Sequence, residues 1–491
     1  MLKDIQRTVK HTVIIALGKI CSKLVGFILL PIYTKEISVT DYGVLGLLEV
    51  FELIGAQIFS IGLHQALLRW YSISINSNEK KKVLFSAFIF ISFLSILSIL
   101  VVISTRHSLS VLLFDKAIYG DFFIYVIFSI SFLNIAKISQ TVLRAEEKTL
   151  FYSISVFVQF LLSLVLNIYF VAILKMGVKG VLLASSISSG FLFLILLPYQ
   201  LKRMVVKIDF HLINEMMAFS YPFIFTAIGA TILNLGDRYL LTKLSSLTEV
   251  GLYSLGYKFS NILKIFLVDA FTLGLPIVAW KIVKNDNQPK RFFSKALTYS
   301  VFLLIWCGLT LSAYSKGIIH VFALNKDYWD ANLVVPYLIV GVIFLGMSQN
   351  FYFVLQIPRK TKNISLIIAT AAILNILLNF IFIPTYGMMA SAIITMVSQL
   401  WAILFAFFQV KKYYPIKFEI MRILLMFLVA TGLYFLTMLF DDYSIVIRII
   451  LKGFIVFSFP FILFVLKFYE PVELESIKRI SKKLMNLKTG H

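Results

Sequence analysis

Long apolar segments recur along this chain, and they restrict its fold more than any other feature. Each is about 20 residues long, which is the length a helix needs to cross about 30 Å of hydrocarbon. The pattern predicts an all-α polytopic membrane protein. The fourteen predicted spans are residues 12–33, 43–69, 83–104, 121–143, 150–174, 179–200, 214–236, 250–279, 293–313, 329–356, 363–383, 387–409, 419–440 and 443–467.

The composition agrees with this prediction and excludes a water-soluble protein. Of the 491 residues, 60% are hydrophobic and 14% are charged, whereas a soluble domain carries about 25% charged residues. No Pro-, Gly- or Ser-rich linker interrupts the apolar segments, so we expect one membrane body. Cys21 and Cys307 both fall in apolar segments, which indicates small buried side chains rather than a disulfide framework.

The distribution of lysine and arginine predicts the orientation in the membrane. With the amino terminus inside, 26 of the 46 fall in the cytoplasmic segments between the predicted spans and 8 in the outer segments. Positive residues collect on the cytoplasmic side, so we expect both termini there. This placement explains most of the net charge of +22, with inner-leaflet anionic lipid as the expected partner. Nucleic-acid binding is not expected.

An internal repeat predicts how the spans are arranged. Each copy holds six spans, an even number, so both copies keep the same orientation and a pseudo-twofold axis along the membrane normal relates them. At a spacing of 208 residues, six positions around the first turn recur: Thr34, Lys35, Ser38, Thr40, Asp41 and Gly43 match Thr242, Lys243, Ser246, Thr248, Glu249 and Gly251. A second set recurs at a spacing of 212: Val142, Leu143, Lys148 and Thr149 match Val354, Leu355, Lys360 and Thr361.

The repeat also gives the expected domain boundaries. Residues 1–205 form an N-lobe, residues 206–412 a C-lobe, residues 413–468 two additional helices, and residues 469–491 a basic cytoplasmic tail. Two such lobes would enclose a cavity near the midplane that opens alternately to either side. Two interpretations of the tail stay open, a helix lying on the inner leaflet and a solvated segment.

Ionisable side chains deep in the spans are the candidate functional residues, because such groups face a cavity or a charged partner. Lys19 and Lys23 share one face of the first span. We expect them either to line the cavity and meet phosphate or sugar oxygens, or to pair with Glu49 and Glu52 of the second span. Both carboxylates are also candidates for binding a coupling ion.

The second copy offers a further pair. Lys264 lies near the middle of the eighth span and is the third candidate for substrate binding. Asp269 follows five residues later, a poor spacing for a pair on one α-helix, so we expect each to have a partner on another helix. Asp269 is also a candidate for a proton or sodium site. Of the weaker candidates, Lys258 is expected to reach the headgroups and Arg238 to stabilise a helix end.

Several chemistries are not expected. The six histidines show no metal-binding spacing, and no G-x-x-x-x-G-K-[ST] loop for ATP is present, so we predict no metal and no cofactor. The predicted outer loops are short and leave no room for a folded catalytic domain. The chain is therefore not expected to be an enzyme.

Several short segments follow one another in a characteristic order over nearly the whole chain. In the first half they are Gly18 and Gly26, then LLPIYTK, VTDYGVLGL, IGLHQALLRWYS and Arg144-Ala145-Glu146. In the second half they are Tyr221-Pro222, Asp237-Arg238, TEVGLYSLGYKFS and IPTYGMMASAIIT. In their order and spacing they resemble polysaccharide-export flippases of the O-antigen and capsule type, in the multidrug/oligosaccharidyl-lipid/polysaccharide exporter superfamily.

The resemblance implies a bacterial inner-membrane flippase for an oligosaccharide linked to undecaprenyl pyrophosphate, used in capsule, O-antigen or exopolysaccharide assembly. Polysaccharide polymerase machinery is then an expected partner. One alternative is a transporter of the same superfamily with another cargo, either a lipid-linked peptidoglycan precursor or a drug exchanged for protons or sodium. Another is a membrane glycosyl polymerase or ligase. The deep lysines favour an anionic cargo, and the short outer loops disfavour the enzyme.

Overall fold

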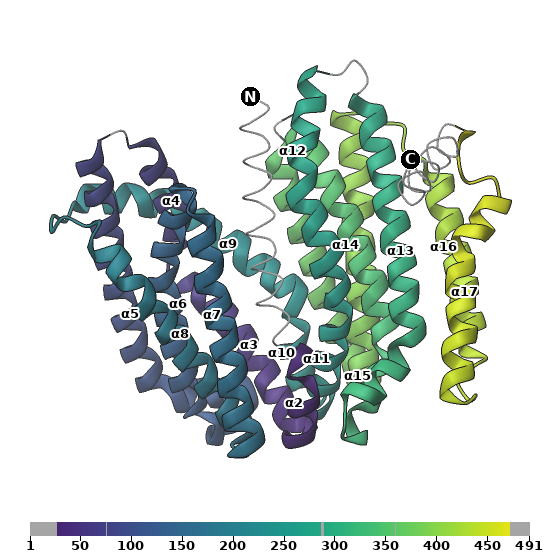
Figure 1. Cartoon of the computed structure of the whole chain (residues 1–491), viewed down its shortest axis with the longest axis horizontal. Helices are drawn as coiled ribbons and strands as arrows, with labels where there is room; N and C mark the ends of the chain where they lie inside the picture. The colour runs from purple at the N-terminus through teal and green to yellow at the C-terminus, as the bar shows by residue number, and fades with distance from the viewer. Residues whose placement is uncertain (1–26, 75, 286–288, 359, 472–491) are drawn as a thin grey trace, which may run out of the picture. The chain divides into compact units, whose positions relative to one another are not determined.

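The computed structural model describes residues 27–74, 76–285, 289–358 and 360–471, and within these ranges every regular element is a helix (Figure 1). In the first half the elements are α2 (Leu30–Glu36), α3 (Val39–Ile58), α4 (Leu63–Ile73), α5 (Ser77–Phe114), η1 (Ala117–Tyr119), α6 (Phe122–Ala145), α7 (Thr149–Asn167), η2 (Ile168–Ile173) and α8 (Gly177–Leu201). In the second half they are α9 (Phe210–Leu235), α10 (Asp237–Leu244), α11 (Leu247–Leu263), η3 (Lys264–Val268), α12 (Asp269–Asn285), α13 (Pro289–Phe322), η4 (Lys326–Leu333), α14 (Val335–Gln356), α15 (Thr361–Tyr413), α16 (Ile420–Met438) and α17 (Ile445–Val465).

The predicted all-α membrane fold is confirmed, but the predicted number of spans is not. Nine helices of the described residues are long and apolar enough to cross a membrane, or ten if the bent pair α3 and α4 is one span. Some predicted spans are interrupted: α11 has 17 residues and continues through the π-helical turn η3 into α12. Two others are merged in α15, which bends at Gly387 (φ 52°). The first predicted span, 12–33, lies mostly outside the described residues.

Helix α5 shows the side-chain distribution of a membrane helix. Phe93, Ile96 and Leu100 lie on one face and are each about 60% exposed, whereas Ser95 and Ser98 on the other face are buried. A water-soluble helix would present the opposite pattern. Small residues at the inner face allow neighbouring helices to approach closely, so the apolar face of α5 is the one that meets lipid.

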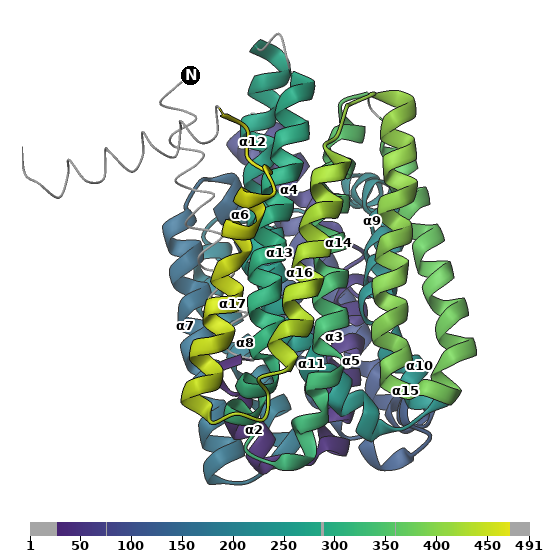
Figure 2. The ribbon, with the colours of Figure 1, turned by 90° about the vertical axis from the view of Figure 1, so that its right-hand side faces the viewer.

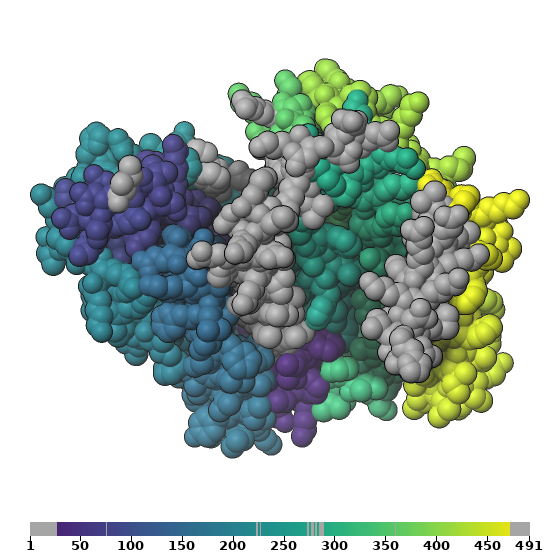
Figure 3. All heavy atoms as spheres, turned by 45° about the horizontal axis from the view of Figure 1, so that its top comes forward, coloured from purple at the N-terminus to yellow at the C-terminus, as the bar shows by residue number. Residues whose placement is uncertain are grey.

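The chain divides into two compact units. The first comprises residues 1–278 and 316–414 and therefore contains most of both sequence repeats. Within it, helices α4, α5 and α6 pack around a buried core that includes Leu67, Leu84 and Ile138. The elements from α4 to α8 form a continuous block of purple and blue atoms in Figure 3.

The second unit comprises residues 279–315 and 415–491, and α16 and α17 run side by side in it (Figure 2). The indole N–H of Trp306 donates to the carbonyl of Val456 (3.1 Å). Lys452, buried in α17, donates to the carboxylate of Asp441 (2.5 Å) and to the carbonyl of Ala313 (2.7 Å). These polar contacts attach α17 to α13 and to the loop that joins α16 to α17.

Candidate functional site

The repeated turn of the sequence begins two equivalent helices, α3 and α11, in the same way. The hydroxyl of Ser38 accepts a hydrogen bond from the N–H of Asp41 (3.1 Å), and that of Ser246 accepts one from the N–H of Glu249 (3.2 Å). Both serines are helix N-caps and satisfy backbone donors that have no partner inside the helix. The sequence repeat is therefore also a repeat of local structure.

These two helices touch each other reciprocally. A Cβ atom on Gly43 would overlap the carbonyl oxygen of Leu247, and one on Gly251 would overlap the carbonyl oxygen of Val39. Val39 and Leu247 are equivalent positions, as are the two glycines. Gly43 of α3 meets Leu247 of α11, and the equivalent Gly251 of α11 meets the equivalent Val39 of α3. The contact therefore has local twofold symmetry. Only glycine allows backbones to come this close.

Hydrogen bonds strengthen this contact between the repeats. The hydroxyls of Thr40 and Thr248, which are equivalent positions, lie 3.0 Å apart. The hydroxyl of Tyr328, in η4 of the second repeat, donates to the carbonyl of Ile37 in the first (2.9 Å). The segment from Ile37 to Gly43 is therefore held against the second repeat by both backbone packing and side-chain bonds.

A cluster of three charges lies further along the same two helices. Oε1 of Glu49 is 3.1 Å from Nζ of Lys258, and its Oε2 is 3.5 Å from Nη1 of Arg238. Arg238 also donates to the carbonyl of Gly46 (3.1 Å), and the ammonium of Lys258 lies 4.9 Å from the ring centre of Tyr42. One carboxylate from the first repeat thus faces two cations from the second, so the cluster carries a net positive charge.

The roles predicted from the sequence for Lys258 and Arg238 differ from what this cluster shows. The prediction that Lys258 reaches the headgroups is wrong, because its ammonium pairs with Glu49. Arg238 does lie in the first turn of α10, but its guanidinium reaches across to the first repeat. The partners of both side chains depend on which helices become neighbours, and the depth of a residue within a span does not reveal its neighbouring helix.

The predicted partners of Glu49 and Glu52, Lys19 and Lys23, lie outside the described residues. Glu52 is one turn from Glu49 on α3 and accepts a hydrogen bond from the hydroxyl of Ser129 on α6 (2.9 Å). That hydroxyl is also within 3.3 Å of two serine hydroxyls of α8. Glu52 therefore sits in a polar group formed entirely by the first repeat.

Asp237, next to Arg238, is buried with a different set of partners. Its carboxylate accepts hydrogen bonds from the hydroxyl of Tyr253, the hydroxyl of Thr395 (3.2 Å) and the N–H of Arg238 (2.9 Å). All three donors are neutral. A buried carboxylate held by neutral donors is expensive in its charged form, and this makes Asp237 a candidate for binding a proton or a cation.

Lys264 and Asp269 lie close to each other, although their spacing is a poor one for a pair on a regular α-helix. Nζ of Lys264 is 3.9 Å from Oδ1 of Asp269. The five residues from Lys264 to Val268 form the π-helical turn η3, in which i→i+5 hydrogen bonds replace the α-helical ones. That turn brings residues five apart onto the same side, so the spacing becomes suitable for a pair.

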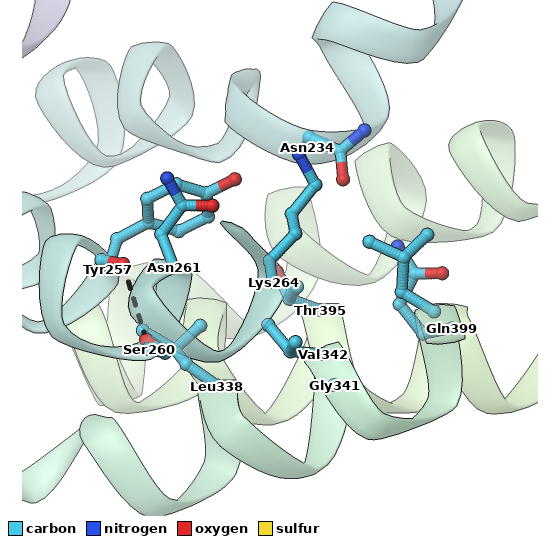
Figure 4. Close-up of a pocket in the computed structure, with 11 residues that line it drawn as sticks. Asn234, Tyr257, Ser260, Asn261, Lys264, Leu338, Gly341, Val342, Thr395 and Gln399 are labelled. Atoms are coloured by element: carbon cyan, nitrogen blue, oxygen red, sulfur yellow. Dashed lines mark hydrogen bonds between the residues drawn. The ribbon is translucent and has the colours of Figure 1, made fainter. Parts of the chain in front are cut away.

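Lys264 also lines a small pocket within the second repeat (Figure 4). Its side chain extends toward Asn234 of α9, with Asn261 of α11 and Gln399 of α15 on the other sides of the pocket. Thr395, the partner of Asp237, belongs to the same lining. The pocket therefore contains one of the three predicted substrate-binding lysines and several amide groups.

The amide residues of this pocket escaped the sequence prediction. That prediction considered ionisable groups in the apolar spans, whereas Asn234, Asn261 and Gln399 are neutral. The sequence does mark them, because an Asn or Gln within an apolar segment also needs a hydrogen-bond partner. Among the described residues, no three His, Cys, Asp or Glu side chains lie close enough together to hold a metal ion.

A second charged cluster lies where α6 ends, at Glu146. Its carboxylate accepts hydrogen bonds from the hydroxyls of Tyr71 and Tyr199 (both 2.7 Å) and pairs with Lys148 (2.6 Å) and Arg203 (3.3 Å). Burial alone would raise the pKa of Glu146, but the hydrogen bonds from Lys148, Tyr199 and Tyr71 and the charge of Arg203 together lower it to about 2. The cluster joins the ends of α4, α6 and α8.

The chain matches the sequence model of one protein family, described as "Polysaccharide biosynthesis protein", over residues 8–279. This match covers more than half of the chain. No curated protein sequence matches the chain significantly.

Solved structures of membrane transporters are similar in fold. The lipid II flippase MurJ, in an inward closed conformation, aligns with a TM-score of 0.77 and 17% identity, over 92% of this chain and 99% of that one. A multidrug resistance MATE family transporter of the MOP superfamily aligns with a TM-score of 0.67 and 12% identity, over 80% and 95%. The Vibrio cholerae MATE transporter VcmN aligns with a TM-score of 0.59 and 15% identity, over 84% and 98%.

Proposed function

Because the chain belongs to the polysaccharide biosynthesis protein family, we propose that it is a flippase for lipid-linked oligosaccharide units in the bacterial inner membrane. The proposed cargo is an oligosaccharide on undecaprenyl pyrophosphate, for capsule, O-antigen or exopolysaccharide assembly. Sugars and phosphates lose their water when they enter hydrocarbon, and each unpaired polar group then costs free energy. Such a cargo crosses only where a protein supplies polar partners.

The observation that carries this proposal is the charged contact between the two repeats. Glu49 of the first meets Arg238 and Lys258 of the second, close to the reciprocal contact of α3 and α11. Two repeats that touch at one side of the membrane can stay apart at the other side, which leaves the cavity between them open there. When the contact between the repeats opens and the opposite side closes, the cavity becomes accessible from the first side instead. We propose residues 1–205 and 206–412 as the two moving bodies.

The charge of this cluster favours an anionic cargo. A diphosphate accepts short, charge-assisted hydrogen bonds from lysine and arginine, and two cations face one carboxylate here. A cationic drug would instead require acidic groups in excess. The fold similarity to a lipid II flippase also supports a lipid-linked cargo, so a peptidoglycan precursor is the main alternative.

The orientation and the coupling ion complete the proposal. We place both termini in the cytoplasm, where the basic segments meet anionic lipid, and the polymerase machinery beside the released product. For proton or sodium coupling, Asp237 joins the candidates Glu52 and Asp269, because its carboxylate is buried among neutral donors. We propose no catalytic role for the chain.

The test is leaflet translocation of undecaprenyl diphosphate carrying a short oligosaccharide, measured in proteoliposomes. Lys258→Met keeps most of the side-chain length and removes the charge. We expect translocation to slow by about tenfold or more, since a hydrogen bond to a charged group contributes about 1.5–3 kcal/mol and about 1.4 kcal/mol corresponds to tenfold. Lys116→Ala, on the exposed link between α5 and η1, is the control and should keep the rate of the intact protein.

Two results would contradict the proposal. If the intact protein leaves the glycolipid in its original leaflet and exchanges a small cation against a proton or sodium gradient, the proposed cargo is wrong. If Lys258→Met and Lys116→Ala translocate the glycolipid equally fast, Lys258 has no part in cargo movement.

A further inference from the structure

The turn between α14 and α15 has an equivalent in the first repeat, the turn between α6 and α7. Each turn ends at a lysine with nearly the same backbone conformation, Lys148 with φ −79° and ψ 52° and Lys360 with φ −93° and ψ 46°. The N–H of Lys148 donates to the carbonyl of Leu143 (2.8 Å), and that of Lys360 donates to the carbonyl of Leu355 (3.0 Å). The two lysines are 212 residues apart, as are the two leucines, so the two turns are repeats of one structure.

Both lysines also meet a tyrosine in the same way. Nζ of Lys148 is 5.3 Å from the ring centre of Tyr199, near the end of α8. Nζ of Lys360 is 4.8 Å from the ring centre of Tyr413, the last residue of α15. An ammonium within about 6 Å of an aromatic ring is attracted to the ring face. Each repeat therefore places a lysine and a tyrosine side by side at the same end of its helices.

The first repeat supplies an anion to its lysine and tyrosine, and the equivalent turn of the second repeat does not. Oε2 of Glu146 accepts hydrogen bonds from Nζ of Lys148 (2.6 Å) and from the hydroxyl of Tyr199 (2.7 Å). Pro358 occupies the position equivalent to Glu146, 212 residues later. The sequence contains no Asp or Glu from residue 331 to residue 418. Neither α14, α15 nor the turn between them can therefore provide the carboxylate.

Further donors lie around Tyr413. The ammonium of Lys412 is 5.3 Å from its ring centre, and the amide of Asn363 lies beside its hydroxyl. That amide is oriented by the side chain of Gln409, whose oxygen accepts a hydrogen bond from Nδ2 of Asn363 (2.7 Å). Lys360 and Lys412 are both exposed. Two cations, a hydroxyl and an amide thus meet at a place that a ligand can reach.

We propose that these four side chains, Lys360, Asn363, Lys412 and Tyr413, form a binding site for a phosphate group. The ligand is either the phosphate headgroup of a membrane lipid or a free phosphate. Phosphate oxygens accept charge-assisted hydrogen bonds from lysine and hydrogen bonds from hydroxyl groups. A phosphate here would take the place that the Glu146 carboxylate takes in the first repeat. The site does not depend on the proposed cargo, because it shares no residue with the cluster around Glu49.

The experiment measures binding of dioctanoyl phosphatidic acid to the full-length protein in detergent by native mass spectrometry. Lys360→Met keeps most of the side-chain length and removes the charge, and we expect it to weaken binding by about tenfold. Lys148→Met is the matched control, because it changes the equivalent lysine at a site that Glu146 already fills. It should bind phosphatidic acid as tightly as the intact protein does.

A second variant reverses the difference between the repeats. Pro358→Glu places a carboxylate at the position that Glu146 has in the first repeat. The new carboxylate would pair with Lys360 and repel a phosphate, so we expect it to abolish binding of phosphatidic acid. Tyr413→Phe removes only the hydroxyl and should weaken binding by about fivefold. It tests the site from another element if Lys360→Met does not fold, which the melting temperature of that variant would reveal.

Added inorganic phosphate distinguishes the two sources of the ligand. If it displaces phosphatidic acid, the site accepts free phosphate, and if it does not, the lipid headgroup is the ligand; either result supports the site when Lys360→Met binds more weakly than Lys148→Met. The proposal is overturned if the intact protein binds neither ligand, if Lys360→Met and Lys148→Met bind equally well, or if Pro358→Glu binds as the intact protein does. None of these results bears on glycolipid translocation, so the proposed function is tested separately.

Discussion

The two cations around Glu49 are not equivalent. The Arg238 side chain is 3% exposed and its guanidinium is also fixed by the carbonyl of Gly46, whereas the Lys258 side chain is 19% exposed. A lysine ammonium is also a mobile point charge, unlike the planar guanidinium. An entering anion would therefore compete with Glu49 for Lys258 first. This is the reason for choosing Lys258 as the residue that tests the cargo.

Glu146 gives a pH-dependent prediction, because its pKa is lowered to about 2, below the ordinary value of about 4.3. A lowered pKa stabilises the folded state above the ordinary value, and this stabilisation is lost as the pH falls toward the pKa of the folded state. We expect Glu146→Gln to lower the melting temperature by a constant amount between pH 7 and about pH 5.5. The difference should shrink below about pH 4.5. Thermal unfolding in detergent at a series of pH values measures it.

The same series includes its own control. Glu79→Gln changes an exposed carboxylate in the first turn of α5. If Glu146→Gln and Glu79→Gln lose the same amount at every pH, the hydrogen bonds from Tyr71 and Tyr199 do not stabilise the ionised carboxylate of Glu146.

At the scale of elements, the sequence predicted most helices correctly because apolar runs and polar breaks report directly on burial in lipid. It also predicted that α3 and α11 are equivalent, from the repeated turn before each. The π-helical turn η3 was not predictable, since one extra residue in a turn leaves no mark on an apolar run. The proximity of Lys264 to Asp269 depends on that turn, and so no pattern in the sequence indicated it.

The close approach of α3 and α11 predicts the effect of Gly43→Ala. The new Cβ would overlap the backbone carbonyl of Leu247, which cannot rotate away, so the helices must move apart. We expect a loss of about 1–3 kcal/mol, the usual cost of overpacking, measured as a lower melting temperature. Gly251→Ala should lower the melting temperature by a similar amount, because Gly251 meets the carbonyl of Val39 as Gly43 meets that of Leu247. Gly229→Ala, in α9 with no atom within 4 Å of the added Cβ, should keep the melting temperature or raise it slightly.

If Gly43→Ala melts at the same temperature as Gly229→Ala, the two helices do not pack as closely as described. That result would also remove the basis for local twofold symmetry, because the reciprocal glycine contacts define it. A loss for only one of the two glycines would show that the contact is not reciprocal.

For the whole molecule, the central question is whether the contact between the repeats opens during transport. The hydroxyls of Thr40 and Thr248 are 3.0 Å apart, so thiols placed at these two positions would start close to each other, as disulfide formation requires. In a chain with Cys21→Ser and Cys307→Ser, we expect Thr40→Cys with Thr248→Cys to cross-link on mild oxidation. Glycolipid translocation should then fall to the level of protein-free liposomes, and a reductant should restore it.

The loss of translocation on cross-linking is expected only if the contact between α3 and α11 opens during transport. A contact that only stabilises the fold could be cross-linked without loss, since the bond adds to an arrangement already present. A contact that must open once in each cycle cannot. The single variants Thr40→Cys and Thr248→Cys, oxidised in the same way, should keep the uncross-linked rate. Undiminished translocation by the fully cross-linked protein would show that α3 and α11 stay together throughout transport, and the moving parts would then have to lie elsewhere in the chain.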